Sequence, residues 1–130
     1  MKYRLPEFKP GRRFAGPLPP DSDIISSIEA TCKELSIQTA SFEVRGAVSA
    51  FTIGTYDQNQ QVYVTHSQAA PREIVACSGT VSLQDGQPKA DARIVLSDEE
   101  GKTTGGRLFS QTIIFAGEID LQELIGAQLE

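Results

Sequence analysis

One segment near the start of the chain carries apolar residues at helical spacing. Apolar side chains recur every three or four residues there: Ile24, Ile28, Cys32 and Leu35, with Ile25 beside them. This is the period of one face of a helix. Pro19-Pro20 ends the element before it, and Asp21 or Ser22 can accept hydrogen bonds from the first exposed amides. The pattern predicts an amphipathic helix of two to four turns whose apolar stripe packs on a sheet.

The rest of the chain is rich in β-branched and aromatic residues, which are typical of strands. The segments with this character are 38–48, 50–56, 62–65, 73–83, 90–97, 106–115 and 119–125. Gly46 and Gly54 lie inside them and indicate bulges or close approach of the backbone. One helix followed by sequential strands predicts an α+β fold with a mostly antiparallel sheet.

Two turns set the register of three neighbouring strands. Asp85-Gly86 is typical of a two-residue hairpin turn, and it places Ser78 opposite Arg93. The polar loop 98–102 then places Arg93 directly opposite Arg107. The two turns therefore predict that two arginines face each other across a strand pair.

Alternation along these strands separates two faces of the sheet. One face is apolar, and we expect it to form the core: Val75, Cys77, Val81, Ala92, Ile94, Leu96 and Leu108. The other mixes polar and charged groups with large apolar ones: Ser78, Thr80, Asp91, Arg93 and Arg107, with Ile74, Val95 and Phe109. Such a mixture is unusual for a solvated face, so we expect this face to meet a partner.

Charge is unevenly distributed along the 130 residues, whose formal net charge is -5. Residues 1–13 carry a single acidic residue and five basic ones, while residues 14–130 carry seven basic and sixteen acidic residues. We therefore expect a solvated basic arm, 1–13, followed by one domain, 14–130. An acidic body repels DNA, so DNA contact is expected to be weak and to come from the arm: Lys2, Arg4, Lys9, Arg12 and Arg13.

The residues that usually carry catalysis or bind metals are sparse. Cys32 and Cys77 are far apart and have no CxxC spacing, so they are expected to be free, buried thiols. His66 is the one histidine, and neither a zinc site nor a Cys–His pair is expected from it. The GxSxG, HExxH and Gly-rich phosphate-loop motifs are absent. The sequence predicts no enzyme, no catalytic residue and no cofactor. It also has no signal sequence or apolar run long enough for a membrane, so a cytoplasmic protein with no membrane contact is expected.

Five motifs in order resemble those of the plants-and-prokaryotes-conserved (PPC) domain family. They are LPPDSDI, VRGAVSAFTIGTYD, EIVACSGTVS, DGQP and ARIVLSDEEGKTTGGRLF, and the similarity runs from about Phe14 to Ile125. The resemblance implies a compact α+β domain that forms homotrimers by packing sheets around the three-fold axis. Members are described as candidate DNA-binding proteins. In plants a separate AT-hook contacts DNA, while this domain supports assembly and protein–protein contact; the Arg-Gly-Arg-Pro core of an AT-hook is absent here.

The sequence departs from the family where some members hold a metal. The family's H-x-H and GGH positions read Asp91-Ala92-Arg93 and Gly105-Gly106-Arg107 here. Arginine is not a zinc ligand, so no metal is expected. Glu73 of the family's EI-x-S motif is retained and, like Asp91, is expected near the arginines as a carboxylate partner. Gly79, Gly105 and Gly106 are expected to meet backbone requirements rather than to contact a ligand.

Three functions remain open at this point. The preferred one is a non-enzymatic homotrimeric module that assembles with itself or with another protein. The second is a DNA-binding protein that uses the basic arm. The third is a small-anion-binding protein, or a relic enzyme, that uses Arg93 and Arg107 with Asp91 and Glu73 nearby.

Overall fold

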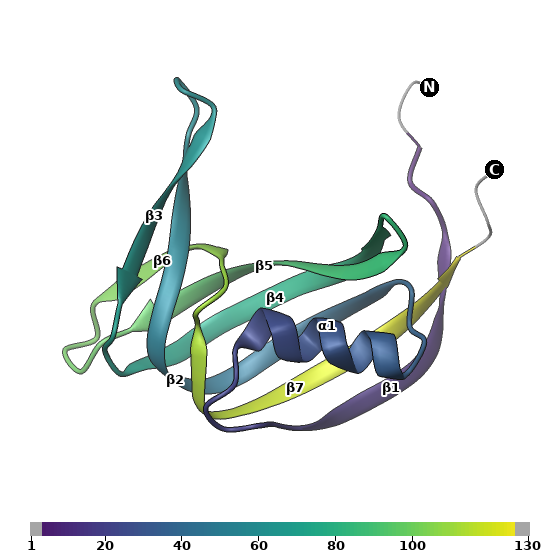
Figure 1. The fold of residues 1–130 in the computed structure, drawn as a ribbon, viewed down its shortest axis with the longest axis horizontal. Coiled ribbons are helices and arrows are strands. Elements are labelled where there is room, and N and C mark those ends of the chain that lie inside the picture. The colour runs from purple at the N-terminus through teal and green to yellow at the C-terminus, as the bar shows by residue number, and fades with distance from the viewer. Residues whose placement is uncertain (1–3, 127–130) are drawn as a thin grey trace.

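The structure, a computed structural model, describes residues 4–126. Within this range the chain forms one helix and seven strands, and Figure 1 shows the helix lying across one face of the sheet. In chain order the elements are β1 (Phe8–Leu18), α1 (Ile24–Glu34), β2 (Ala40–Asp57), β3 (Val62–Gln68), β4 (Arg72–Gln84), β5 (Gln87–Ser97), β6 (Thr103–Leu108) and β7 (Ile113–Gly126). All strand pairings are antiparallel. The expected α+β fold with one amphipathic helix is confirmed.

The long strand β2 organises the sheet, because it pairs with four other strands. Its first part lies between β7 and β4, and its last part lies between β3 and β6. The strand order is β1-β7-β2-β4-β5-β6, and β6 returns to β2 through the pairs Ile53–Leu108 and Gly54–Arg107. Strands β2, β4, β5 and β6 therefore close into a small barrel.

Two strand boundaries differ from the sequence expectation. Segments 38–48 and 50–56 form one continuous strand, β2, which bends at a bulge next to Gly46, where φ is +130°. Segment 106–115 is instead split, because β6 ends at Leu108 and β7 begins at Ile113. The break allows the chain to pass from the barrel to the other side of β2.

Helix α1 covers the core through the predicted stripe. Ile24, Ile28 and Cys32 are fully buried in the core that α1 shares with the sheet. The cap is Asp23, not Asp21 or Ser22 as expected: its carboxylate accepts hydrogen bonds from the backbone amide and hydroxyl of Ser26. Asp21 instead occupies the turn before the helix with φ +63°.

The predicted register of β4, β5 and β6 is confirmed. Ser78 lies opposite Arg93, and Arg93 lies opposite Arg107. The two faces are also as expected, except around a bulge between Ile74 and Ala76. The extra residue turns Ile74 into the core, where it is 7% exposed, and leaves Val75 56% exposed. The sequence expectation, with Val75 in the core and Ile74 on the other face, was therefore wrong for both side chains.

The N-terminal segment is not a free arm over its whole length. Strand β1 begins at Phe8 and pairs with β7 from Phe8–Gly126 to Leu18–Gly117, so the expected boundary at residue 13 falls inside a strand. One edge of β7 pairs with β2, and its other edge is free to pair with β1. Because backbone hydrogen bonds hold β1 at this edge, the strand forms without an alternating apolar pattern in its sequence. Residues 4–7 precede the strand, and Lys2 lies outside the described residues.

Both cysteines are buried, free thiols, as expected. Burial raises the pKa of the Cys77 thiol to about 12 and that of Cys32 to about 11, the latter with help from the charges of Glu123 and Glu29. Because the thiolate is the reactive form, we expect neither thiol to react with a maleimide in the folded protein at pH 7. Both should react in denaturant, as measured by mass spectrometry. Labelling of one thiol at full rate in native buffer would contradict the packing around it.

The single helix among the described residues has 11 residues and is too short to cross a membrane.

Candidate functional site

A band of polar side chains crosses the face of the sheet that α1 leaves uncovered. Strand alternation places these residues there, since their sequence neighbours Phe42, Cys77 and Ala92 are buried in the core. One row across the strands reads Asp120, Glu43, Ser78, Arg93 and Arg107, and the next reads Arg13, Gln122, Ser41, Thr80 and Asp91. The band therefore runs from β1 to β6, and the predicted arginine pair lies at its β6 end.

Asp91 links the two arginines. Its Oδ1 atom accepts a hydrogen bond from Nη1 of Arg93 at 2.7 Å and lies 3.4 Å from Nε of Arg107. The three side chains are partly open to solvent, with exposed fractions of 58% for Arg93, 49% for Asp91 and 36% for Arg107. The expected carboxylate between the arginines is thus present, but a single carboxylate oxygen faces both guanidinium groups.

Two aromatic rings hold Arg107. Its guanidinium carbon lies 5.1 Å from the centre of the Tyr63 ring and 5.6 Å from that of Phe109, within the range of cation–π attraction. The two rings contact each other edge to face. Gly54 makes room for them, because a Cβ at that position would lie 2.4 Å from the Phe109 ring. The close approach expected at Gly54 is therefore a packing requirement of this arginine's surroundings.

Glu73 does not join this cluster. It lies on β4 opposite Ser97, whereas Arg93 lies on β5, four residues before Ser97 and opposite Ser78. At about 3.3 Å per residue these four residues span about 13 Å, and the ion pairs of both arginines in the described chain go to Asp91 instead. The expectation that Glu73 partners the arginines was wrong, because it relied on shared motifs and not on the register.

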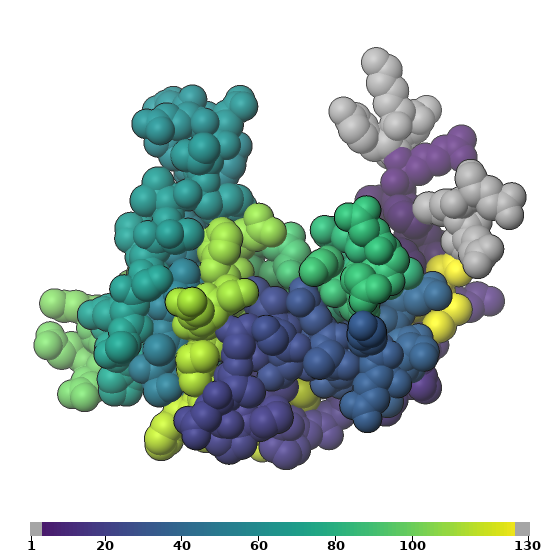
Figure 2. Space-filling model, viewed as in Figure 1, coloured from purple at the N-terminus to yellow at the C-terminus, as the bar shows by residue number. Residues whose placement is uncertain are grey.

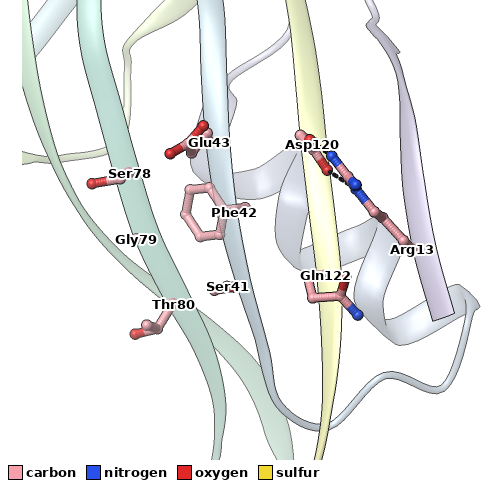
Figure 3. Close-up of a pocket in the computed structure, with 9 residues that line it drawn as sticks. All are labelled: Arg13, Ser41, Phe42, Glu43, Ser78, Gly79, Thr80, Asp120 and Gln122. Atoms are coloured by element: carbon pink, nitrogen blue, oxygen red, sulfur yellow. Dashed lines mark hydrogen bonds and ion pairs between the residues drawn. The ribbon is translucent and has the colours of Figure 1, made fainter. Parts of the chain in front are cut away.

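A shallow pocket of about 430 Å³ occupies the other part of the band. Figure 3 shows its lining residues on β1, β7, β2 and β4, with Arg13 and Asp120 joined across its rim. Arg13 donates to both carboxylate oxygens of Asp120, at 3.0 and 2.6 Å. This pairing holds the pKa of Asp120 below its usual range. The pocket ends at Ser78 and Thr80, directly opposite Arg93 and Asp91.

Two of the expected DNA-contact residues are engaged in ion pairs. Arg13 is bound to Asp120, and Arg12 holds the carboxylate of Glu123 through its backbone amide, Nε and Nη2. Arg12 also donates to the carbonyl oxygen of Leu35 at the end of α1. These contacts fasten β1 to β7 and to the helix, so their charge is largely compensated. Of the other candidates, Arg4 and Lys9 are exposed.

The Arg12–Glu123 pair makes the stability of the fold depend on pH in the acidic range. Hydrogen bonds from Arg12 lower the pKa of Glu123 below its ordinary value of 4.5. A lowered pKa stabilises the fold above the unfolded value, and the contribution is lost as the pH falls through the folded pKa. We expect the urea midpoint to decrease below about pH 4.5, and Glu123→Gln to reduce that dependence. Glu118→Gln removes an exposed carboxylate 3.7 Å from Arg45 and serves as the control. Equal slopes in both variants would contradict the prediction.

The residues present do not fit the metal that the family resemblance implies. Arg93 and Arg107 carry positive charge and no lone pair for a cation. Among the described residues, no three side chains of His, Cys, Asp or Glu come together in a metal-binding arrangement. We expect metal analysis of the purified protein to find no stoichiometric zinc, and chelator to leave the melting temperature unchanged. One tightly bound zinc per chain would contradict this expectation.

Sequence reasoning missed Tyr63 and the role of Phe109 at this site. Tyr63 is on β3, which pairs with β2, and it reaches Arg107 because β6 also pairs with β2. No local motif signals this barrel closure. The one available signal was Gly54 in an otherwise β-branched segment.

Two solved structures are similar to this chain in both shape and sequence. The metal-containing protein AF0104 from Archaeoglobus fulgidus is 34% identical, with a TM-score of 0.90, covering 95% of this chain and 87% of that protein. A plant- and prokaryote-conserved (PPC) protein from Pyrococcus horikoshii is 30% identical, with a TM-score of 0.91, covering 98% of this chain and 89% of that one.

A more distant structure shares the fold. It is a candidate DNA-binding protein from Bacteroides thetaiotaomicron, 19% identical with a TM-score of 0.80, covering 89% of this chain and 83% of that one. Among curated proteins, none matches the sequence. The model of the Plants and Prokaryotes Conserved domain matches residues 5–125. With almost the whole chain matched, this protein belongs to the PPC domain family.

Proposed function

We propose that this protein is a non-enzymatic, homotrimeric PPC-domain module whose role is assembly with itself or with another protein. A projecting hairpin carries the proposal. Strands β2 and β3 extend beyond the barrel as a two-stranded ribbon, and Figure 2 shows this ribbon standing clear of the rest of the molecule. The proposal places the protein in the cytoplasm, where free thiols stay reduced.

Both faces of this hairpin carry exposed apolar side chains. Val62 and Val64 share one face and are 46% and 47% exposed, while Tyr56 on the opposite face is 50% exposed. Isolated two-stranded hairpins are marginally stable in water. The outer edge of β3 is also open to pairing, since β3 pairs only with β2 in the described chain. A neighbouring copy that packs on this hairpin would cover its apolar groups and stabilise its edge.

The uncovered face of the sheet adds further apolar surface. Val75, Val95 and Phe115 are 56%, 36% and 68% exposed on β4, β5 and β7. Large exposed apolar side chains on both the sheet and the hairpin favour burial against partners. They are the residues that a symmetric assembly would cover.

Light scattering with size-exclusion chromatography tests the proposal. We expect a mass of three chains at micromolar concentration. The double variant Val62→Thr, Val64→Thr should shift the protein toward smaller species. Leu83→Thr is the matched control, because Leu83 is 44% exposed at the β4–β5 hairpin, and it should leave the mass unchanged. A wild-type monomer would overturn the proposal.

DNA binding is the second candidate function, favoured by relatives described as candidate DNA-binding proteins. With Arg12 and Arg13 held in ion pairs, only Arg4 and Lys9 among the described candidates remain to contact phosphates, and Lys2 lies outside the described residues. Few phosphate contacts mean weak binding with a shallow salt dependence. A gel shift across salt concentrations tests it: tight, sequence-specific binding at physiological salt would favour DNA recognition over assembly.

A further inference from the structure

We propose that Arg93 and Arg107 form a binding site for a small oxyanion of the phosphate or carboxylate class. The site lies on the uncovered sheet face, where β5 and β6 pair beside the base of the β2–β3 hairpin. It borders the apolar surface on which the assembly proposal rests, since Val95 lies two residues from Arg93 on β5. Its ligand chemistry follows from the charge balance, the fixed position of Arg107 and the distance of other carboxylates.

The charge at the site is not balanced. Two guanidinium groups face each other across a strand pair, where like charges destabilise. Asp91 supplies one negative charge, and its contacts with the pair use Nη1 of Arg93 and Nε of Arg107. A net positive charge and further N–H donors remain. An oxyanion offers the acceptors that these donors can bind in a forked geometry.

Arg107 is held in a fixed position before any ligand arrives. The Tyr63 and Phe109 rings lie near its guanidinium, and Gly54 provides the space that the rings need. Such packing reduces the conformational entropy that a long side chain loses on binding. With 36% of its side chain exposed, Arg107 remains accessible to a small anion.

The protein's other carboxylates do not complete the pair. Glu73 lies too far along β4, as described above. Glu43 is two strands from Arg93 in the same row, about 10 Å at the spacing of neighbouring strands. Within residues 4–126 the carboxylate that contacts either arginine is that of Asp91. An external anion is therefore the group that balances the second guanidinium.

Titration with inorganic phosphate and with acetate, followed by NMR of the ¹⁵N-labelled full chain at constant ionic strength, tests the proposal. We expect saturable shifts centred on Arg93, Arg107 and the neighbouring Gly106. Arg93→Gln should weaken binding roughly tenfold or more, as expected for loss of a charge-assisted hydrogen bond. Asp91→Asn should tighten it, because a competing negative charge is removed. The anion that binds more tightly identifies the ligand class.

Arg72→Gln is the matched control. Arg72 also lies over an aromatic ring, that of Phe51 at 5.5 Å, but it is outside the pair, so its loss should leave affinity unchanged. If Arg107→Gln does not fold, Arg93→Gln carries the test, since its side chain is mostly exposed. Absence of shifts at the pair, equal weakening by Arg72→Gln, or no tightening by Asp91→Asn would each overturn the proposal.

Discussion

Replacing Asp23 by alanine is expected to lower the free energy of unfolding by about 3 kcal/mol, combining a lost helix cap with unsatisfied amides. One carboxylate oxygen accepts from the amide and hydroxyl of Ser26 in the first turn of α1. The other accepts from the backbone amides of Gln111 and Thr112, at 2.7 and 3.1 Å. Thr112 is fully buried, so its amide has no access to water when the carboxylate is removed.

Urea unfolding measures this loss, with Asp57→Ala as the control. Asp57 also accepts two backbone hydrogen bonds, from Asn59 and Gln60, but in an exposed hairpin turn. Water replaces those bonds, so we expect a change below about 1 kcal/mol. Asp23→Asn should fall between the two, because its amide can accept on one side only. Equal losses for Asp23→Ala and Asp57→Ala would show that the link between helix and loop contributes little.

The sequence specifies this fold best where local chemistry determines geometry. The Asp85-Gly86 turn has positive φ at both residues, +52° and +77°, which is the conformation that the dipeptide favours. This turn fixed the register of β4 and β5 and, with the next loop, correctly placed Arg93 opposite Arg107. Asp91 followed from the same alternation. The sequence therefore predicted the members of the arginine cluster on β5 and β6, but not Tyr63, which β3 contributes.

Tertiary contacts decided what the sequence did not show. Strand β1 contains Pro10, Gly11 and Pro17, and its pairing depends on the edge of β7 and the Arg12–Glu123 contact. Such pairing has no periodic signature. The bulge in β4 is also set by tertiary pairing. One extra residue there reverses which side chains before it face the core, so Ile74 is buried and Val75 is exposed, and the local composition gives no sign of this change.

The helix cap shows the same limit at smaller scale. Asp21, Ser22 and Asp23 are all acceptable cap residues by type. Asp23 is selected because the loop at Gln111 and Thr112, far away in sequence, needs the second oxygen of the same carboxylate. A local pattern identifies the helix start to within two residues, and the rest of the fold chooses among them.

Gly106→Ala is expected to open the barrel and to destabilise the protein by about 3 kcal/mol or more, at the upper end of overpacking costs. A Cβ at Gly106 would lie 2.3 Å from the carbonyl oxygen of Gly54. The oxygen belongs to the backbone and the position of the Cβ is set by the backbone that carries it, so no side-chain rotation relieves the clash. Strands β2 and β6 must therefore separate there. Since they are joined through the pairs Ile53–Leu108 and Gly54–Arg107, this separation disrupts the contact that closes the barrel. The expectation that Gly106 meets a backbone requirement is thus supported by the geometry.

The same substitution links the fold to the arginine pair. Arg107 follows Gly106 directly, and its contact with Tyr63 depends on β6 lying against β2. If the variant folds, we expect the Nε resonance of Arg107 to move toward that of a solvated arginine, together with a decreased urea midpoint. Gly16→Ala is the matched control in β1, because a Cβ there meets nothing within 4 Å; its stability should change by less than about 0.5 kcal/mol. A Gly106→Ala variant as stable as Gly16→Ala, with Arg107 unshifted, would mean that β6 is not closed against β2 in solution.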